Sequence, residues 1–445
     1  MRSFFIFLFF LPFAISAQDV AGEEAFGKFS YDQFEKPEAC KSCHVDFYYQ
    51  WQQAMMSQAY THEWDEIEYF KLAVPHAEKD EKVAGVKAGC NGCHAPISFL
   101  AGDTPPPPPG ANSRANESVS CDVCHTIVGF KGDIPYNFNY ISKPGRTKYG
   151  PKPGLDSPHH RTEYNEFITT AEFCGTCHNE KSPYGAWVKA TQIEWKEGPY
   201  AKQGVVCQDC HMPKAEGRNA VMVEGTDMVA QHLFHGAHDK GKLRGVIEMR
   251  IHPNERELEP GETVVFSLQL HNAKAGHKVP SGSAEERVLW VHVEAITPDG
   301  TVYHLPVDKK GFEGEEYTIA SDVLAYQDMA IPLGLTDFKG IRREEVPIGD
   351  RIFRKPYLDP QGRMTIMQWN TASFGPDYRI GPRETKIETY TWIIPDEIPP
   401  GRVKIKASLY YRKLPKPVQE FLNVPEEESK EVLINTAETY IEILE

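Results

Sequence analysis

Ten cysteines and five histidines of this 445-residue chain form one pattern repeated five times: two thiols separated by two residues, then a histidine. Both thiols of such a site can add to the vinyl groups of one haem, and the adjacent imidazole binds its iron as fifth ligand. A thioredoxin-like pair would occur once, and zinc sites would not place a histidine after every pair. The pattern therefore predicts five covalently attached haem c groups and no disulfide. The sites are Cys40, Cys43 and His44; Cys90, Cys93 and His94; Cys121, Cys124 and His125; Cys174, Cys177 and His178; Cys207, Cys210 and His211.

The sixth ligand of each iron must come from elsewhere in the chain, which has 17 histidines in all. Some of them lie in alternating, strand-like sequence, where a histidine is usually a surface or hydrogen-bonded side chain: His252, His271, His292 and His304. Histidines near the motifs or in turn-rich segments are better candidates. These are His76, His159, His160, His232, His235, His238 and His277.

The sixth ligand of the first haem is the least determined. A helix-like run follows His44, from which Met55 or Met56 could supply a thioether, and His62 an imidazole. Core packing is the usual role of a methionine on such a helix face. The choice matters because Met/His ligation raises the reduction potential above that of two histidines.

The segment that carries the motifs, residues 40–211, must enclose five large apolar cofactors with little chain for each. The haems themselves then form the core, and short helices with long loops are expected around them. The gaps between motifs alternate in length. This alternation predicts that the second and third haems, and the fourth and fifth, form close pairs.

From about residue 246 the hydrophobic pattern changes to the alternation that is typical of strands with one buried face. The alternating runs, separated by turn signals, predict an antiparallel β-sandwich of immunoglobulin-like or fibronectin-like type. The expected fold is therefore multidomain, with a mainly α and loop haem domain over 18–243 and an all-β sandwich over 244–445. An irregular insertion is expected near 335–381. The alternating runs are 246–251, 263–270, 287–293, 385–393 and 402–409.

Residues 1–17 carry one early positive charge, a short apolar block and small residues at the end. This is the layout of a secretory signal peptide, so we expect export to the periplasm or the cell surface. No later segment is long and apolar enough to predict a membrane span. The formal net charge of −15 argues against a nucleic-acid-binding role and would steer the protein toward positively charged partners.

The motif segment resembles the exported multihaem cytochromes of the cytochrome c-554 and c-prime family. The likeness rests on the five motifs and flanking residues such as Tyr48 and Trp51. Relatives continue into a β-sandwich that opens with an asparagine and a Gly-His-x-x-Pro-x-Gly element, which here resembles Asn272 and residues 276–282. The resemblance implies distal ligands at His232, at His277, and at His159 or His160. Relatives often place a histidine near Met56, where this chain has methionine.

Closely spaced, six-coordinate haems imply electron transfer between other redox proteins, without a substrate site. Two alternatives remain open. A multihaem oxidoreductase acting on a small nitrogen or sulfur species would need a five-coordinate haem, and a missing distal ligand at the first haem would create one. All five motifs keep the histidine that pentahaem nitrite reductases replace with lysine. A subunit of an extracellular cytochrome filament would instead lend a histidine to a haem of its neighbour.

Overall fold

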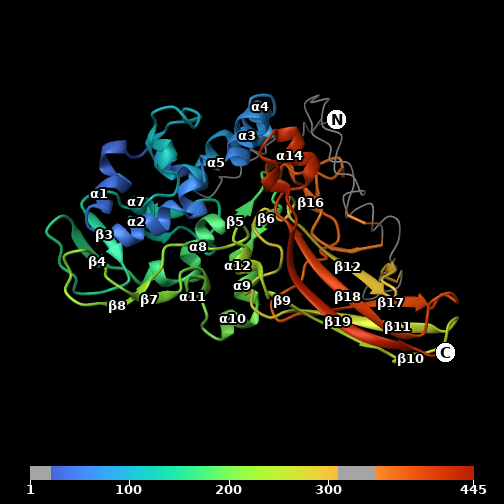
Figure 1. The fold of residues 1–445 in the computed structure, drawn as a ribbon. Coiled ribbons are helices and arrows are strands. Elements are labelled where there is room, and N and C mark those ends of the chain that lie inside the picture. Colours follow the sequence, from blue (N-terminus) through green and yellow to red (C-terminus); the bar gives the residue numbers. More distant parts are fainter. Residues whose placement is uncertain (1–21, 309–345, 348) are drawn as a thin grey trace, which may run out of the picture.

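The computed structural model describes residues 22–308, 346–347 and 349–445. The predicted signal peptide, residues 1–17, lies outside these ranges, as does part of the expected insertion, residues 335–345. The chain forms a region of short helices and loops from its N-terminal half and a region of long strands from its C-terminal half (Figure 1). This helical region followed by a β-rich region confirms the predicted fold class.

The helices of the N-terminal half are short, and the longest of those described, α5, has nine residues. Proline occupies the first turn of α1, α6 and α10, where its fixed φ suits a helix start. Helix α6 ends at Gly102, whose φ of 79° a glycine adopts without strain. The helices are α1 (Pro37–Lys41), α2 (Val45–Gln52), α3 (Glu63–Glu68), α4 (Val74–Ala77), α5 (Val86–His94), α6 (Pro96–Ala101), α7 (Cys121–Cys124), α8 (Ala171–His178), α9 (Thr191–Glu197), α10 (Pro199–Lys202), α11 (Cys207–His211) and α12 (Lys240–Leu243).

In residues 22–308, four two-stranded sheets lie among these helices: two between the third and fourth motifs, one between the fourth and fifth, and one after the fifth. Strands β3 and β4 are parallel, and the other pairs are antiparallel. The pairs are β1 (Ile127–Phe130) with β2 (Tyr140–Ser142), β3 (Thr147–Gly150) with β4 (Arg161–Tyr164), β5 (Asn179–Lys181) with β6 (Trp187–Ala190), and β7 (Lys214–Gly217) with β8 (Asp227–Ala230).

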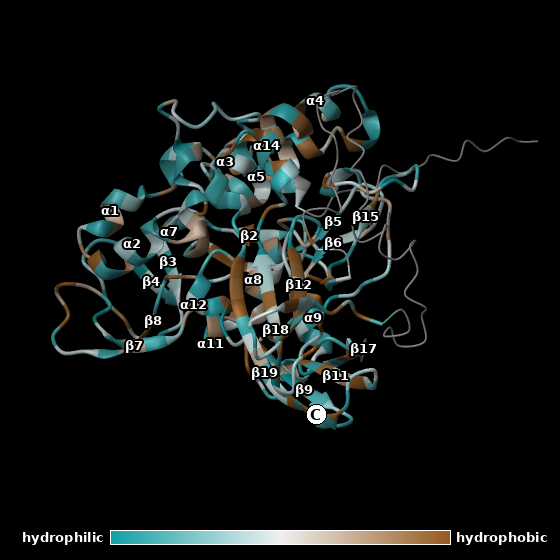
Figure 2. Cartoon of the chain, turned by 45° about the vertical axis from the view of Figure 1, so that its right-hand side comes forward, coloured by the Kyte–Doolittle hydropathy of each residue, from teal (hydrophilic) through white to brown (hydrophobic). Residues whose placement is uncertain are grey.

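The C-terminal half is a β-sandwich. One sheet has the order β17-β11-β9, and the other has β10-β19-β18-β12-β13 with β14 also paired to β12. Apolar side chains of both sheets, such as Leu268 and Val291, form one core between them. Strand β12 begins with a continuous apolar run, whereas apolar and polar residues alternate along β18 (Figure 2). The strands are β9 (Ile247–Pro253), β10 (Glu257–Leu258), β11 (Thr263–Asn272), β12 (Val288–Ile296), β13 (Val302–His304), β14 (Arg351–Phe353), β17 (Thr385–Ile393), β18 (Gly401–Arg412) and β19 (Val432–Ile443).

A second apolar cluster joins the two regions. It combines Trp64 and Leu72 of the helical region with Trp290 on β12, Met367, and Leu422 of α14 (Lys416–Leu422). Strand β12 is therefore buried on both faces along its first half, toward the sandwich core on one side and toward the helices on the other. The sandwich is thus packed firmly against the region that carries the motifs.

The described part of the expected insertion contains only short elements besides β14. They are β15 (Tyr357–Leu358), a 3-10 turn (Gln368–Asn370) and β16 (Ser373–Phe374). Among the helices within the described ranges, none combines the length and the apolar character needed to cross a membrane.

Candidate functional site

Each of the five motifs lies wholly or partly in a short helix. The last four occupy α5, α7, α8 and α11, and the first spans α1 and the turn before α2. Because residues three apart share one helix face, both thiols of a motif point to the same side, with the histidine next to the second. All ten thiols are free of disulfides.

Four of the five motif histidines are oriented by a hydrogen bond between Nδ1 and a backbone carbonyl. A carbonyl only accepts hydrogen bonds, so Nδ1 carries the proton and Nε2 keeps its lone pair. This is the arrangement that metal-binding histidines normally show. The Nδ1–O distances are 2.5 Å from His44 to Asn219, 2.6 Å from His94 to Ala59, 2.8 Å from His125 to Tyr149 and 2.7 Å from His211 to His235.

Three motif histidines face a second, nearly parallel histidine ring. Two imidazoles bound to one metal at about 2 Å have ring centroids roughly 6 Å apart, and the three pairs have this spacing. The centroid distances and interplanar angles are 6.3 Å and 29° for His44 with His160, 6.3 Å and 23° for His125 with His232, and 6.4 Å and 17° for His211 with His277.

The three facing histidines are held in the same way as the motif histidines. Each has Nδ1 against a backbone carbonyl, which again leaves the Nε2 lone pair free. The distances are 3.2 Å from His160 to Arg161 O, 3.0 Å from His232 to Ala230 O and 2.8 Å from His277 to Lys278 O.

Burial favours the neutral imidazole in this region. It lowers the pKa of His178, His211 and His232 to about 4, because the charged form loses its water. The rings are therefore neutral at pH 7, which is the form that binds iron.

The motif histidines His94 and His178 differ from the other three. In the part of the chain that the structure describes, neither has a histidine ring stacked opposite it. Ionisable side chains are buried around their motifs instead. The Lys189 ammonium on β6 lies 2.7 Å from Glu180 Oε2, and both charges act on the thiol of Cys90, whose pKa burial raises to about 12.

Four more ionisable residues are buried nearby, one in the helical region and three just before β12: Glu68, Glu285, Glu286 and Arg287. Burial, reinforced by the neighbouring Glu286 carboxylate, raises the pKa of Glu68 and Glu285 well above the usual range. Nothing in the sequence marks these residues or Lys189 as functional. Charged residues are common in loops and short strands, and only the fold buries these.

Thiols of different motifs lie beside one another and show which haem edges adjoin. Cys40 interacts with Cys121, Cys93 with Cys177, and Cys174 with Cys207. The fourth and fifth motifs are therefore neighbours in the fold. The third motif, however, contacts the first, and the second contacts the fourth. The spacing of motifs along the chain does not predict this because the intervening helices and loops, and the strands β1 to β4 after the third motif, fold the chain back between them.

The first motif is faced by His160 and not by its neighbour His159, whose side chain is exposed. The ring of His160 therefore occupies the position opposite His44, where the sequence allows Met56 as the sixth ligand of the first haem. Met56 lies in a 3-10 turn (Met55–Gln58), and its carbonyl accepts the backbone N–H of Val119.

His76 is engaged elsewhere in the fold. The indole N–H of Trp369 donates to its Nδ1 at 3.1 Å, and its Nε2 lies 3.7 Å from a carboxylate oxygen of Asp80. A histidine that accepts at Nδ1 carries its proton on Nε2 when neutral, so it has no free lone pair for iron. His76 is therefore not among the sixth ligands that we propose for the haems.

A loop at the start of the sandwich carries His277 toward the helical region. Asn272, at the end of β11, donates to the carbonyl oxygens of His277 at 3.1 Å and of Ile380 at 3.2 Å. Its own side-chain oxygen accepts the N–H of Ala275 at 2.9 Å. One amide therefore holds the loop at two points and joins it to the segment that contains Ile380.

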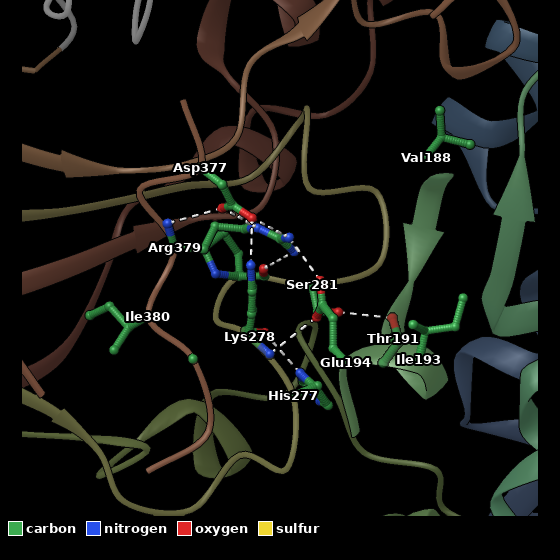
Figure 3. A network of polar contacts seen from close by, with 12 residues as sticks. Val188, Thr191, Ile193, Glu194, His277, Lys278, Ser281, Asp377, Arg379 and Ile380 are labelled. Atoms are coloured by element: carbon green, nitrogen blue, oxygen red, sulfur yellow. Dashed lines mark hydrogen bonds and ion pairs between the residues drawn. The ribbon is translucent and has the colours of Figure 1, made fainter. Parts of the chain in front are cut away.

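Four charged residues tie this loop to both regions (Figure 3), and we call them the loop anchor: Glu194 on α9, Lys278, Asp377 and Arg379. The Arg379 guanidinium donates twice to Asp377, at 2.9 Å each, and once to Glu194, at 2.7 Å. Lys278 donates its N–H to Glu194 at 3.1 Å and its ammonium to Asp377 at 2.8 Å. Burial alone would raise the pKa of Asp377, but its two cationic partners hold it below the usual range.

Two family descriptions match the chain. The cytochrome c554 and c-prime family covers residues 39–126, and the N-terminal region of the NapC/NirT cytochrome c family covers residues 160–255. No curated protein sequence matches significantly.

The chain is similar to the solved structure of a penta-heme cytochrome c552 from Thermochromatium tepidum. The TM-score is 0.62 at 20% identity, over 92% of this chain and 99% of that chain. A CARDB domain from Pyrococcus furiosus overlaps 45% of this chain and 91% of its own length, with 11% identity and a TM-score of only 0.19. The first comparison shows a shared fold across both regions.

Repeated attachment motifs, matches to two cytochrome families and this fold lead to one conclusion: the chain is a multihaem c-type cytochrome with covalently bound haem c.

Proposed function

We propose that the protein is an exported pentahaem electron carrier, in which five haem c groups pass electrons between redox partner proteins. The ten motif cysteines hold the haems, and the five motif histidines supply the fifth ligands. His160, His232 and His277 supply the sixth ligands of the first, third and fifth haems. The proposal rests mainly on the three pairs of imidazole rings, whose spacing is that of two histidines bound to opposite sides of one iron. A six-coordinate haem has no open position for a substrate, so its chemistry is electron transfer.

The thiol contacts support a continuous path. The first and third motifs touch, as do the fourth and fifth, and Cys124 of the third acts on Cys174 of the fourth. Because thioethers mark haem edges, electrons would pass from the first haem through the third and fourth to the fifth. The second haem would join this path at the fourth, through Cys93 and Cys177.

Export supports the same role. Haem c is typical of compartments outside the cytoplasm, and residues 1–17 have the layout of a signal peptide. We propose the periplasm or the cell surface as the location. The net charge of −15 would favour positively charged partners through small, salt-sensitive contacts.

One observation favours a second candidate function, a multihaem oxidoreductase for a small nitrogen or sulfur species. Neither His94 nor His178 is faced by a histidine among the described residues, and buried acids and a lysine surround their motifs. Reductions of such species consume protons, which Glu68 could deliver beside an open haem, because burial raises the pKa of its carboxyl well above the usual range.

Electron paramagnetic resonance of the fully oxidised protein, before and after adding cyanide, tests the two candidates. The electron carrier should give low-spin signals from all five haems and no change with cyanide. A high-spin ferric signal that cyanide converts to low spin would refute a carrier-only role and support the second candidate. The variant His232→Ala, which removes the proposed sixth ligand of the third haem and leaves His125 in place, serves as the positive control for a high-spin signal.

A further inference from the structure

We propose that His292, His304 and Asp350 form a binding site for one divalent transition-metal ion on the β-sandwich, distinct from the haem sites. The three residues offer ligand atoms that all lie within 4.8 Å of one another. None belongs to an attachment motif, and none is among the proposed haem ligands. The sequence alone gave the two histidines the role of ordinary strand side chains.

The strand register places both histidines on one face of the sheet. Glu294 of β12 pairs with His304 of β13, so His292, two residues before Glu294, is a diagonal neighbour of His304. Val291 and Val293 point into the sandwich core, so the intervening His292 points away from it. The two imidazoles are nearly parallel, with centroids 4.8 Å apart and an interplanar angle of 14°.

Asp350 reaches this face from the turn before β14. Gly349 precedes it with a φ of 100°, and its carbonyl accepts the N–H of Val307 at 2.9 Å. A Cβ at position 349 would lie 2.6 Å from Pro306 Cβ and 3.3 Å from His304 Cε1. Only glycine allows this turn to approach His304 so closely. The Asp350 side chain is 0% exposed.

Asp350 Oδ1 lies as far from each imidazole nitrogen as two ligands at right angles around one metal ion would lie from each other. Asp350 Oδ1 lies 2.9 Å from His292 Nδ1 and 2.8 Å from His304 Nε2. Ligands about 2.1 Å from a metal and at right angles to each other are about 3 Å apart, whereas a tetrahedron requires about 3.4 Å. Two histidines and one carboxylate on one face are a known set for first-row transition metals. The histidine side chains are 23% and 34% exposed, so water can fill the remaining positions.

The surroundings also suit a cation. The Glu294 carboxylate lies 4.0 Å from His292 Nε2, on the side where a ligating histidine commonly has an acidic partner. Lys406 pairs with the other oxygen of Glu294 at 2.9 Å, so its charge is already balanced. Without a metal, both imidazoles direct N–H groups at the Asp350 carboxylate: His304 at Oδ1, and His292 at Oδ1 and, at 3.1 Å, at Oδ2. A metal ion replaces these two protons with one shared partner.

Zinc binding to the full-length, haem-loaded protein tests the proposal, since haem iron would obscure added iron. After dialysis against a chelator, calorimetry and elemental analysis should find one tight Zn²⁺ per chain. The variant His304→Gln keeps a side-chain N–H toward Asp350 but is a poor ligand, so zinc affinity should fall about 100-fold or more. Asp350→Asn should have the same effect. The matched control is His252→Gln, which changes an exposed histidine on β9 and should bind like the wild type.

Zinc should also raise the Tm of the wild type and of His252→Gln, but not that of His304→Gln. An unchanged haem absorption spectrum in every variant shows that the fold persists. The proposal is overturned if the wild type binds zinc no more tightly than His304→Gln, or if His252→Gln weakens binding as much. Both outcomes would mean that His292, His304 and Asp350 are only a hydrogen-bonded group.

Discussion

The loop anchor gives the sharpest prediction: Arg379→Met should destabilise the protein and loosen the sixth ligand of the fifth haem. The Arg379 side chain is only 6% exposed and Glu194 only 9%, and they meet at 2.7 Å. The substitution keeps most of the side-chain volume but removes every hydrogen bond of the guanidinium. Glu194 is then left buried without its cation, while Asp377 retains Lys278 at 2.8 Å.

Removal of one partner from a buried ion pair costs about 3–5 kcal/mol, because the remaining charge stays buried and uncompensated. The lost bond from Arg379 to the carbonyl of Pro280, at 3.2 Å, adds to this cost and acts directly on the loop. His277 is three residues before Pro280, so its ring should leave the position opposite His211 in part of the molecules. We expect a drop of about 3–5 kcal/mol in the free energy of unfolding and a new high-spin haem signal.

Denaturant unfolding followed by circular dichroism, together with paramagnetic resonance, measures both effects. The control is Lys386→Met, which breaks a more exposed ion pair with Glu384 and should cost less than about 1 kcal/mol. Arg379→Met combined with Glu194→Gln should recover part of the loss, because the stranded charge is removed. If Arg379→Met costs no more than the control, or leaves all haems low-spin, the anchor does not position His277.

Three further substitutions test other parts of the structure. His160→Met should raise the reduction potential of one haem, and an unchanged set of potentials in a redox titration would remove His160 from the ligand set. Burial lowers the pKa of Lys355 to about 8, below its unfolded value of about 10.4, so the fold disfavours the ammonium. The free energy of unfolding should rise by roughly 2–3 kcal/mol between about pH 8 and about pH 10.5, and Lys355→Met should lack this rise; parallel pH profiles would contradict it. A methyl group in Gly92→Ala would overlap the Phe138 ring, which should cost about 1–3 kcal/mol and lower the haem content per chain. Gly150→Ala, with open space around it, should retain five haems.

The fold could be predicted in outline because its two patterns are local. A histidine directly after two thiols specifies haem attachment wherever it occurs, and alternating apolar residues specify a strand with one buried face. The change from one pattern to the other near residue 246 matches the start of β9 at Ile247. The sequence does not reveal that β12 is buried on both faces, because its second apolar face is covered by helices from the other half of the chain.

The candidate site likewise has one part that the sequence predicts and one part that only the fold identifies. Motif residues are adjacent in the chain, so their spacing alone predicts thiols and fifth ligands. The facing histidines are remote from their motifs: His160 lies 116 positions after His44, and His232 lies 107 after His125. Turn-rich surroundings and a family resemblance make them candidates for sixth ligands, but only the fold shows which motif each one faces.

The sequence by itself determined the cofactor chemistry, the absence of spare cysteines and the order of the two regions, since each depends on neighbouring residues. Only the tertiary structure decided which histidine rings face each other, which thiols adjoin, and that the sandwich carries His277 to the fifth motif. It also brought His292, His304 and Asp350 together from two strands and a distant turn. Such contacts join segments far apart in the chain, and their partners are chosen by packing and burial rather than by sequence spacing.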